Sequence, residues 1–212
     1  MITINSKEVA KDLLDFIYDS PTAFQVTENL SKILKENGFV ELRESEEWSL
    51  EKNKKYFLRK NDSALIAFRT GNDDPARAGF RLIAAHSDSP AIKIKPAPEI
   101  SEAGYLKLNT EIYGGPILNT WLDRPLALAG RLSCRGDNPL FTESTLININ
   151  KPLALIPNLA IHLNPEVNKG IELNRQKELL PLIKMVEEDF EKEGYLLSLL
   201  SSESGIPTDR IL

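Results

Sequence analysis

The sequence predicts an α/β protein organised in two parts, and three observations lead to that fold class. Helical periodicity fills the first forty residues, short β-rich runs follow, and one of these runs, residues 81–85, is apolar without alternation. From residue 91 onward, alternating apolar and polar residues recur between turn residues. An apolar strand without alternation is typical of a sheet covered on both faces, whereas alternation is typical of an antiparallel sheet with one exposed face. We therefore expect an α/β part followed by a mostly β part.

Composition limits the class of protein. The 212 residues can form one large domain or two modest ones, and a hydrophobic share of 42% with 27% charged residues is ordinary for a soluble protein. The net charge of -5 gives no basic footprint for nucleic acid. No apolar run approaches the ~18 residues that span a membrane. The N-terminus lacks the features of a signal peptide, and a single cysteine, Cys134, forbids an internal disulfide. These features predict a cytoplasmic protein that binds neither nucleic acid nor membranes.

Two helices are expected in the first forty residues. The apolar face of the first is formed by Val9, Leu13, Phe16 and Ile17, and that of the second by Val26, Leu30, Ile33 and Leu34. Ser20 and Pro21 resemble an N-cap and first-turn pair that opens the second helix. Asn37 and Gly38 are expected to end it.

Most of the remaining segments predict strands. They are residues 39–44, 54–60, 64–71, 81–85, 91–95, 105–115, 127–136 and 144–149. Residues 96–104 are expected to form a loop. Leu179, Ile183, Val186 and Phe190 recur at helical spacing, which predicts a helix that Gly194 ends.

The stretch LIAAHSDSP, residues 82–90, is the first candidate site. His86 follows the apolar run, at the carboxyl end of a buried strand, which is where open α/β sheets bind ligands. An imidazole can bind a divalent metal through one nitrogen while the other donates to a carboxylate. Asp88 stands two residues on and would project to the same side in an extended segment. The pattern therefore predicts a metal ligand with an acid that orients it.

Two plainer interpretations stay open. Ser87 to Ser89 before Pro90 could be a helix N-cap, although the alternation of residues 91–95 argues against a helix there. His86 could also be a hydrogen-bonded residue at a strand end. Zinc usually takes three or four protein ligands, and the sequence has no HExxH motif. The Glu187-Glu188 pair is interpreted as a solvated helix face. This chain alone is therefore expected to supply half a metal site.

Four longer stretches resemble one family in the same order along the chain. They are LIAAHSDSPAIKIKP, EIYGGPILNTWLDRPLALAGRL, LIPNLAIHLNPEVNKG and NRQKELLPLI. They are similar to the M18 metallopeptidases, the aspartyl aminopeptidase family. The resemblance implies a zinc-aminopeptidase-type α/β catalytic domain with an inserted, mostly β dimerisation domain. Residues 1–92 would then be the N-terminal half of the catalytic domain. Residues 93–212 would be the insert and the helices that lead back from it, with the rest of the catalytic domain expected after Leu212.

The resemblance also implies roles for single residues. His86 matches a zinc ligand, and Asp88 matches the acid that orients it. His162 matches a histidine that the insert contributes to the partner subunit's active site, where it binds substrate and the transition state. From the pattern alone, His162 would be a packing residue in an alternating strand. Trp121, Asp123 and Arg124 fall in a W-x-D-R signature, which we interpret as structural, with an ion pair near a strand bend.

The function implied is the removal of N-terminal, preferentially acidic, residues from peptides. Two zinc ions about 3.5–4 Å apart would serve this hydrolysis, with cobalt or manganese as possible substitutes. A carboxylate from outside this sequence would be the general base, and dimers formed through the insert would build a larger homo-oligomer. The alternative is a non-catalytic oligomerisation module or truncated paralogue. A hydrolase with a single metal on His86, Asp88 and other carboxylates is disfavoured by the small number of ligands.

Overall fold

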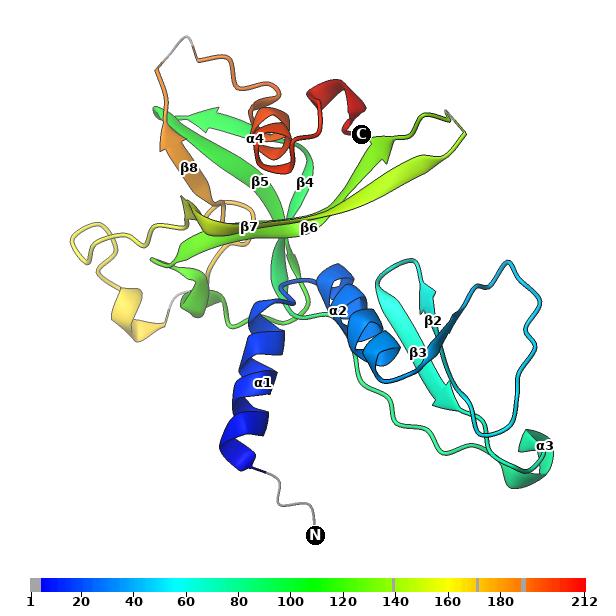
Figure 1. Cartoon of the computed structure of the whole chain (residues 1–212). Coiled ribbons are helices and arrows are strands. Elements are labelled where there is room, and N and C mark those ends of the chain that lie inside the picture. Colours follow the sequence, from blue (N-terminus) through cyan, green and yellow to red (C-terminus); the bar gives the residue numbers. More distant parts are fainter. Residues whose placement is uncertain (1–4, 139, 171, 188–189) are drawn as a thin grey trace. The chain divides into compact units, whose positions relative to one another are not determined.

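The computed structural model describes residues 5–138, 140–170, 172–187 and 190–212. The chain divides into two compact units, residues 1–89 and 90–212, which are treated separately below (Figure 1). The boundary predicted after residue 92 falls inside strand β4 (Ala91–Glu102), the first strand of the second unit. No helix in the described part of the chain is long and apolar enough to cross a membrane.

Two helices begin the first unit, α1 (Ser6–Tyr18) and α2 (Ala23–Glu36). The predicted cap of α2 was wrong by two residues, because Thr22 accepts the N–H of Phe24 at 3.3 Å. The hydroxyl of Ser20 is engaged elsewhere, since it accepts a hydrogen bond from the side chain of Asn29 at 3.0 Å. The end of α2 at residues 37–38 is confirmed, and Gly38 there has the positive φ of 77° that favours glycine.

A three-stranded sheet follows, in the order β1-β2-β3. Its strands are β1 (Val40–Leu42), β2 (Lys55–Lys60) and β3 (Ala64–Arg69), which confirms three of the predicted runs. The pair β1–β2 is parallel and the pair β2–β3 is antiparallel. Helix α2 packs against β2 and β3, and Phe57 on β2 is completely buried.

Ion pairs also join α2 to the sheet. Arg59 on β2 contacts Glu28 of α2 at 3.2 Å and Glu41 of β1 at 3.0 Å. Lys35, near the end of α2, lies 2.7 Å from the other oxygen of Glu41. The hydrogen bond from Lys35 is the main reason that the pKa of Glu41 lies below its ordinary value, and the positive charge of Arg59 adds to it against the opposing effect of burial.

The buried strand predicted at residues 81–85 does not form. After the short helix α3 (Pro75–Ala78), residues 79–90 have no regular structure. The side chain of Leu82 is 87% exposed and that of Ile83 is completely exposed. No strand among the described residues pairs with this segment, so its backbone lacks the ladder of hydrogen bonds that a strand requires.

The second unit is a five-stranded antiparallel sheet. Its remaining strands are β5 (Tyr105–Tyr113), β6 (Pro125–Arg135), β7 (Thr142–Leu155) and β8 (Leu182–Met185), and the order is β4-β5-β8-β7-β6. The predicted runs at 91–95, 105–115, 127–136 and 144–149 are thus confirmed as strands. Short 3₁₀ turns lie at Leu118–Trp121, Val167–Lys169 and Thr208–Arg210.

The loop predicted at residues 96–104 was wrong for most of its length. β4 continues to Glu102 and accommodates the two prolines through a bulge, where the register with β5 shifts between Ile94 and Glu99. Ala97 within the bulge has a φ of 52°. Beyond the bulge, the carboxylate of Glu99 accepts the backbone N–H of Leu196 at 2.9 Å. Glu99, at the end of the bulge, therefore contacts a part of the chain that is distant in sequence.

The helix predicted from Leu179 to Phe190 was also wrong. Pro181 is the third residue of this stretch, a position that the first turn of a helix would tolerate. Its carbonyl accepts the N–H of Leu108 instead, and β8 then pairs with β5. Gly194 precedes a helix, α4 (Tyr195–Ser204), instead of ending one. Glu187 lies outside any helix, and Glu188 lies outside the described residues.

The core of the second unit lies between α4 and the β6–β7 hairpin (Figure 1). Its buried members are Leu132, Cys134, Ile147, Ile149, Leu196, Leu200 and Ile211. The end of the chain joins this core, because the N–H of Leu212 donates to the carbonyl of Ser133 at 2.9 Å. An apolar cavity of about 70 Å³ remains beside it, between the two hairpins.

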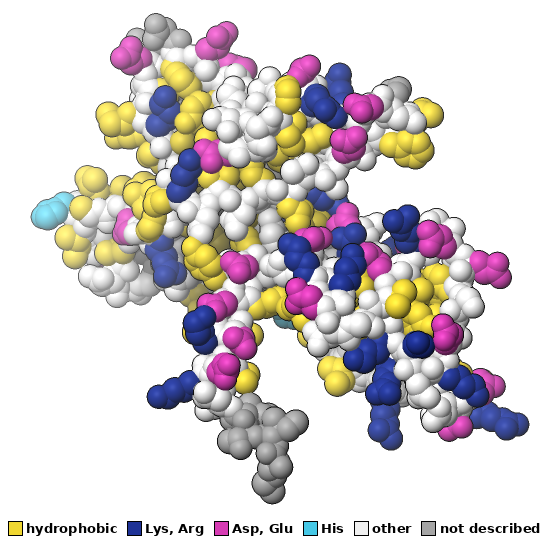
Figure 2. All heavy atoms as spheres, in the orientation of Figure 1, with side chains coloured by type: hydrophobic (Ala, Val, Ile, Leu, Met, Phe, Trp, Pro, Cys, Tyr) yellow, Lys and Arg dark blue, Asp and Glu magenta, His cyan; other side chains and the backbone are white. Residues whose placement is uncertain are grey.

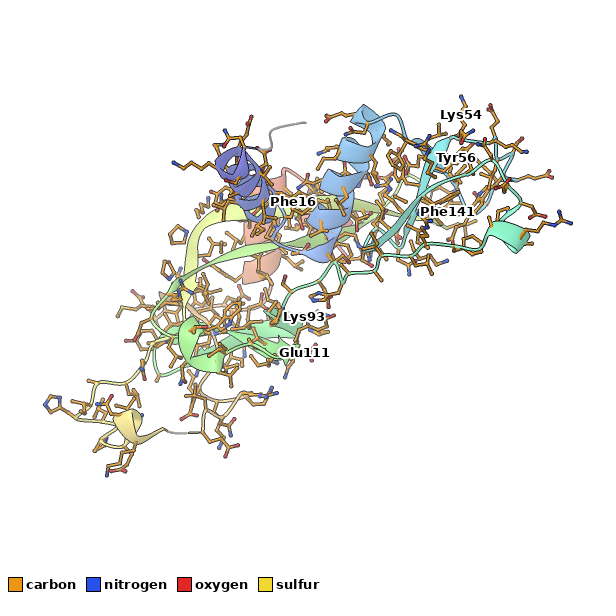
Figure 3. The ribbon with its side chains drawn as sticks, turned by 90° about the horizontal axis from the view of Figure 1, so that it is seen from below. Phe16, Lys54, Tyr56, Lys93, Glu111 and Phe141 are labelled. Atoms are coloured by element: carbon orange, nitrogen blue, oxygen red, sulfur yellow. The ribbon has the colours of Figure 1, made fainter. Side chains whose placement is uncertain are left out.

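The faces of the sheet follow the alternation predicted for residues 91–95. Ile92 and Ile94 line the apolar cavity. Lys93 is exposed and stands opposite Glu111 on β5 (Figure 3). Its ammonium group lies 4.3 Å from the ring centre of Tyr113. At the far end of the β6–β7 hairpin, hydrophobic side chains reach the surface (Figure 2).

Candidate functional site

His86 lies in the irregular segment of the first unit, with its side chain 82% exposed. The ring nitrogen Nδ1 is 2.7 Å from the backbone carbonyl oxygen of Asp88 and 3.3 Å from the carboxylate oxygen Oδ1 of the same residue. A carbonyl oxygen can only accept a hydrogen bond, so Nδ1 carries the proton. In the neutral ring, Nε2 then has a free lone pair, which is the form that binds a metal.

The alternative of a helix N-cap at Ser87 to Ser89 does not hold. No helix follows these residues, because β4 begins at Ala91 directly after Pro90. Asp88 therefore accepts no hydrogen bond from the N–H groups of a helix, and it lies beside the imidazole of His86.

The described residues contain no cluster of three or more His, Cys, Asp or Glu side chains that could hold a metal ion. His86 with Asp88 fits one ligand and its orienting acid, and a zinc site needs two or three further protein ligands. Within the described residues, the fit to zinc is thus that of a single ligand.

His162 lies in an exposed turn of the second unit, so the alternating strand predicted there was wrong. β7 ends at Leu155, and Pro157 has no N–H to continue the ladder. The turn is closed by the N–H of Leu163, which donates to the carbonyl of Ala160 at 2.8 Å. We call residues 156–164 the His162 loop; it leaves the sheet after β7 (Figure 1, yellow).

The His162 loop exposes apolar side chains. Leu159 is 56% exposed, Ile161 52% and Leu163 73%. His162 is itself exposed, so a packing role within its own unit is not supported. Single exposed apolar residues are common, but three beside one histidine form a patch.

Asp123 anchors the start of this loop. Its carboxylate accepts the N–H of Asn158 at 2.9 Å, and its own N–H donates to the carbonyl of Ile156 at 2.9 Å. Arg124 donates to the carbonyl of Thr120 at 3.4 Å. The ion pair predicted between Asp123 and Arg124 was therefore wrong, because each side chain satisfies a backbone group instead. Sequence reasoning missed the anchoring role of Asp123, for which the W-x-D-R signature was the only signal.

The comparisons with known proteins agree with one another. Residues 16–212 match the model of a family described as aminopeptidase I zinc metalloprotease (M18). The chain is 53% identical over 209 residues to a probable M18 family aminopeptidase 2 of Clostridium novyi and 52% identical to one of Clostridium acetobutylicum. Each match covers 98% of this chain and 48% of the relative, so the chain spans about half the length of these relatives.

Solved structures give the same result for the fold. A chain in the cryo-EM structure of the Ape4 and Nbr1 complex aligns with a TM-score of 0.89 at 36% identity, over 97% of this chain and 42% of that one. The S. cerevisiae mApe1 dodecamer aligns with a TM-score of 0.80 at 25% identity, over 99% of this chain and 47% of that one. From the match over residues 16–212 and these identities, the chain belongs to the M18 family of aminopeptidases.

Proposed function

We propose that this chain is part of a zinc-dependent aminopeptidase that removes N-terminal, preferentially acidic, residues from peptides. The observation that carries the proposal is the ring of His86, exposed and held at Nδ1 by Asp88, with Nε2 open to solvent. Family membership supplies the reaction class, and the match to a family described as zinc metalloproteases supports zinc as the metal.

His86 would bind the metal through Nε2. Zinc in such a site supplies Lewis-acid activation of the scissile carbonyl and of a water molecule. Asp88 would keep the proton on Nδ1 and fix the plane of the ring, which preserves the ligand geometry through the reaction. The remaining ligands and the general base would come from outside this chain, because the described residues bring no third metal-binding side chain to His86.

His162 would act in a neighbouring copy. Its exposed loop with apolar neighbours is a surface that another protein chain could cover. The dodecameric relative supports self-association of this fold. An imidazole delivered from the partner subunit could then donate a hydrogen bond to the substrate carbonyl as negative charge develops there.

The alternative function is an oligomerisation module without catalysis. The specific observation in its favour is that the second unit has its own core and strand order, whereas the described residues hold only one fitting metal ligand. The two functions differ in what the gene encodes after residue 212.

The deciding experiment begins by reading the gene beyond residue 212. For the enzyme, the coding sequence continues into further Asp, Glu and His ligands, and its complete product hydrolyses aspartyl and glutamyl chromogenic substrates until a chelator is added. The 212-residue chain alone is expected to be inactive. A natural stop codon directly after Leu212 would establish the module.

A further inference from the structure

We infer that Ser87 is a positioning residue for His86, acting through a hydrogen bond to the turn between β2 and β3. The inference rests on the proposed function of His86 as a metal ligand. The hydroxyl Oγ of Ser87 donates to the backbone carbonyl of Ser63 at 2.7 Å, and this bond is partly buried. The two residues are 24 positions apart, so the contact joins the irregular segment to the folded sheet of the first unit.

The acceptor belongs to a well-defined turn. The N–H of Ser63 donates to the carbonyl of Lys60 at 3.2 Å, and the residues between them, Asn61 and Asp62, have φ angles of 51° and 55°. Two successive positive φ values are those of a type I′ turn, whose twist matches the flanking antiparallel strands. Asp62 also lies 3.8 Å from Arg59 of β2. The carbonyl of Ser63 therefore has a fixed place relative to the sheet.

The segment that carries His86 forms no regular structure. Residues 79–90 pair with no strand among the described residues, and the His86 ring contacts Asp88, two residues away. Those contacts require a particular backbone conformation at Ser87, the residue between them. The bond from Ser87 restrains that residue, while the side chain of His86 stays 82% exposed.

The consequence is a pre-organised ligand. Without the anchor, the segment gains backbone freedom, and the contact between Nδ1 and the Asp88 carbonyl is made only part of the time. The proton can then move to Nε2, which cannot bind a metal while protonated. Ser87 thus acts on the metal through the tautomer of its neighbour.

The test uses the whole 212-residue chain and two readouts. Nitrogen-15 NMR of the imidazole rings, at a pH where they are neutral, gives the tautomer of each histidine. Addition of zinc alone, followed through the same ring signals, gives its affinity for His86. Ser87→Ala removes the hydroxyl, and Ser87→Thr and Ser87→Val form a matched pair of similar shape with and without it. Ser89→Ala makes the same small change at an exposed residue of the same segment, and the ring of His162 is an internal control.

We expect Ser87→Ala and Ser87→Val to lose the preference for a protonated Nδ1 at His86 and to bind zinc about three- to tenfold more weakly, as the loss of one hydrogen bond predicts. Ser87→Thr and Ser89→Ala should resemble the wild type. If Ser87→Ala disturbs the folded unit, the comparison of Thr with Val decides. Equal tautomers and affinities in the Thr and Val proteins would overturn the inference. A tautomer that changes while the zinc affinity does not would overturn the link from Ser87 to the metal, whereas the proposed metal ligand is tested separately by the metal content of His86→Ala in the complete enzyme.

Discussion

A single ring nitrogen decides the chemistry that His86 can perform. Two oxygens of Asp88, one from the backbone and one from the carboxylate, lie within 3.3 Å of Nδ1. The backbone oxygen depends on chain conformation and not on the side chain. Replacement of the aspartate therefore removes only one of the two contacts, and the proposed metal ligand, His86, remains in place.

This difference predicts distinct losses in a complete enzyme that contains this chain. His86→Ala should lower metal content, because a bond to the metal is gone. Asp88→Ala should keep most of the metal but reduce activity about 10–100-fold, the usual effect of losing a residue that orients a ligand. Elemental analysis and kcat/KM measured on the same samples test this, with His162→Ala as a control that should retain metal. An Asp88→Ala protein as metal-poor as His86→Ala would show that the two roles are confused.

The two candidate histidines differ in how far the sequence could identify them. For His86, the pattern of an apolar run ending in H-x-D predicts a ligand beside its orienting acid, and the structure places Nδ1 beside Asp88. For His162, only the resemblance predicts a role in the site. Its alternating neighbours predicted a strand, and the chain instead leaves the sheet at Pro157 and turns. Alternation of apolar and polar residues predicts a strand only if the apolar side chains become buried. The sequence alone does not show that the apolar side chains of this loop stay exposed.

At the scale of elements, α2 is held to the sheet by charge as well as by packing. Glu41 is shared between Lys35 and Arg59, and its side chain is 25% exposed. The pKa of Glu41 is lowered from its ordinary value of 4.5 by these partners. The ionised form is thus favoured in the folded state, and its contribution to stability is present above the unfolded pKa and is lost as pH falls through the folded value.

Glu41→Gln should therefore destabilise the first unit near neutral pH, by about 1 kcal/mol or less, because the pairs are partly exposed. The difference from wild type should shrink as the pH falls below 4.5 and Glu41 becomes protonated in both states. Urea unfolding at several pH values measures this. Glu36→Gln changes an exposed carboxylate and is the control. A Glu41→Gln deficit that stays constant down to pH 3 would mean that charge is not its cause.

Most of the strands were predictable because their apolar and polar residues alternate, as expected for a sheet with one covered face. The errors have specific causes. The bulge of β4 accommodates Pro96 and Pro98, which predicted a loop, and β8 pairs with β5 although its spacing predicted a helix. Residues 81–85 have the composition of a central strand, but a central strand depends on neighbours on both sides. Local sequence indicates which secondary structure a segment favours. A strand also needs another strand to pair with, and that partner can lie anywhere in the chain.

The exposed segment at residues 80–85 should make the chain self-associate. Phe80, Leu82 and Ile83 are 79%, 87% and 102% exposed, and an apolar segment of this length without partners favours pairing with other chains. Ile83→Lys should reduce association as protein concentration rises, measured by light scattering. Ile117→Lys makes the same change at an exposed residue outside any strand. Equal effects of the two substitutions would point to general surface hydrophobicity.

At the scale of the whole molecule, the candidate residues lie in different units: His86 in the first and His162 in the second. If each active site takes His86 from one subunit and His162 from its partner, two variants of the complete enzyme that are each inactive should restore activity when they are combined. Mixed refolding of His86→Ala with His162→Ala gives mixed dimers in half of all pairings, and each contains one intact site. About a quarter of wild-type activity should return.

Mass spectrometry of the refolded sample provides the necessary check on pairing. Mixed dimers without recovered activity would place His162 in the site of its own subunit or remove it from catalysis. Refolding each variant alone controls for residual activity, which should stay near zero in both.

The bulge in β4 also bears on the order in which the chain folds. Helix α4 begins at Tyr195, and Gly194 before it has no side chain to cap it. The N–H of Leu196 donates instead to the carboxylate of Glu99, 97 residues earlier. A helix with a local cap can gain that stabilisation as soon as it nucleates, whereas α4 gains it only once β4 is in place. We expect α4 to be consolidated late, after the rate-limiting barrier. Glu99→Ala should then accelerate unfolding in stopped-flow experiments and leave the refolding rate nearly unchanged, and a slowed refolding limb would place the docking of this helix before the barrier.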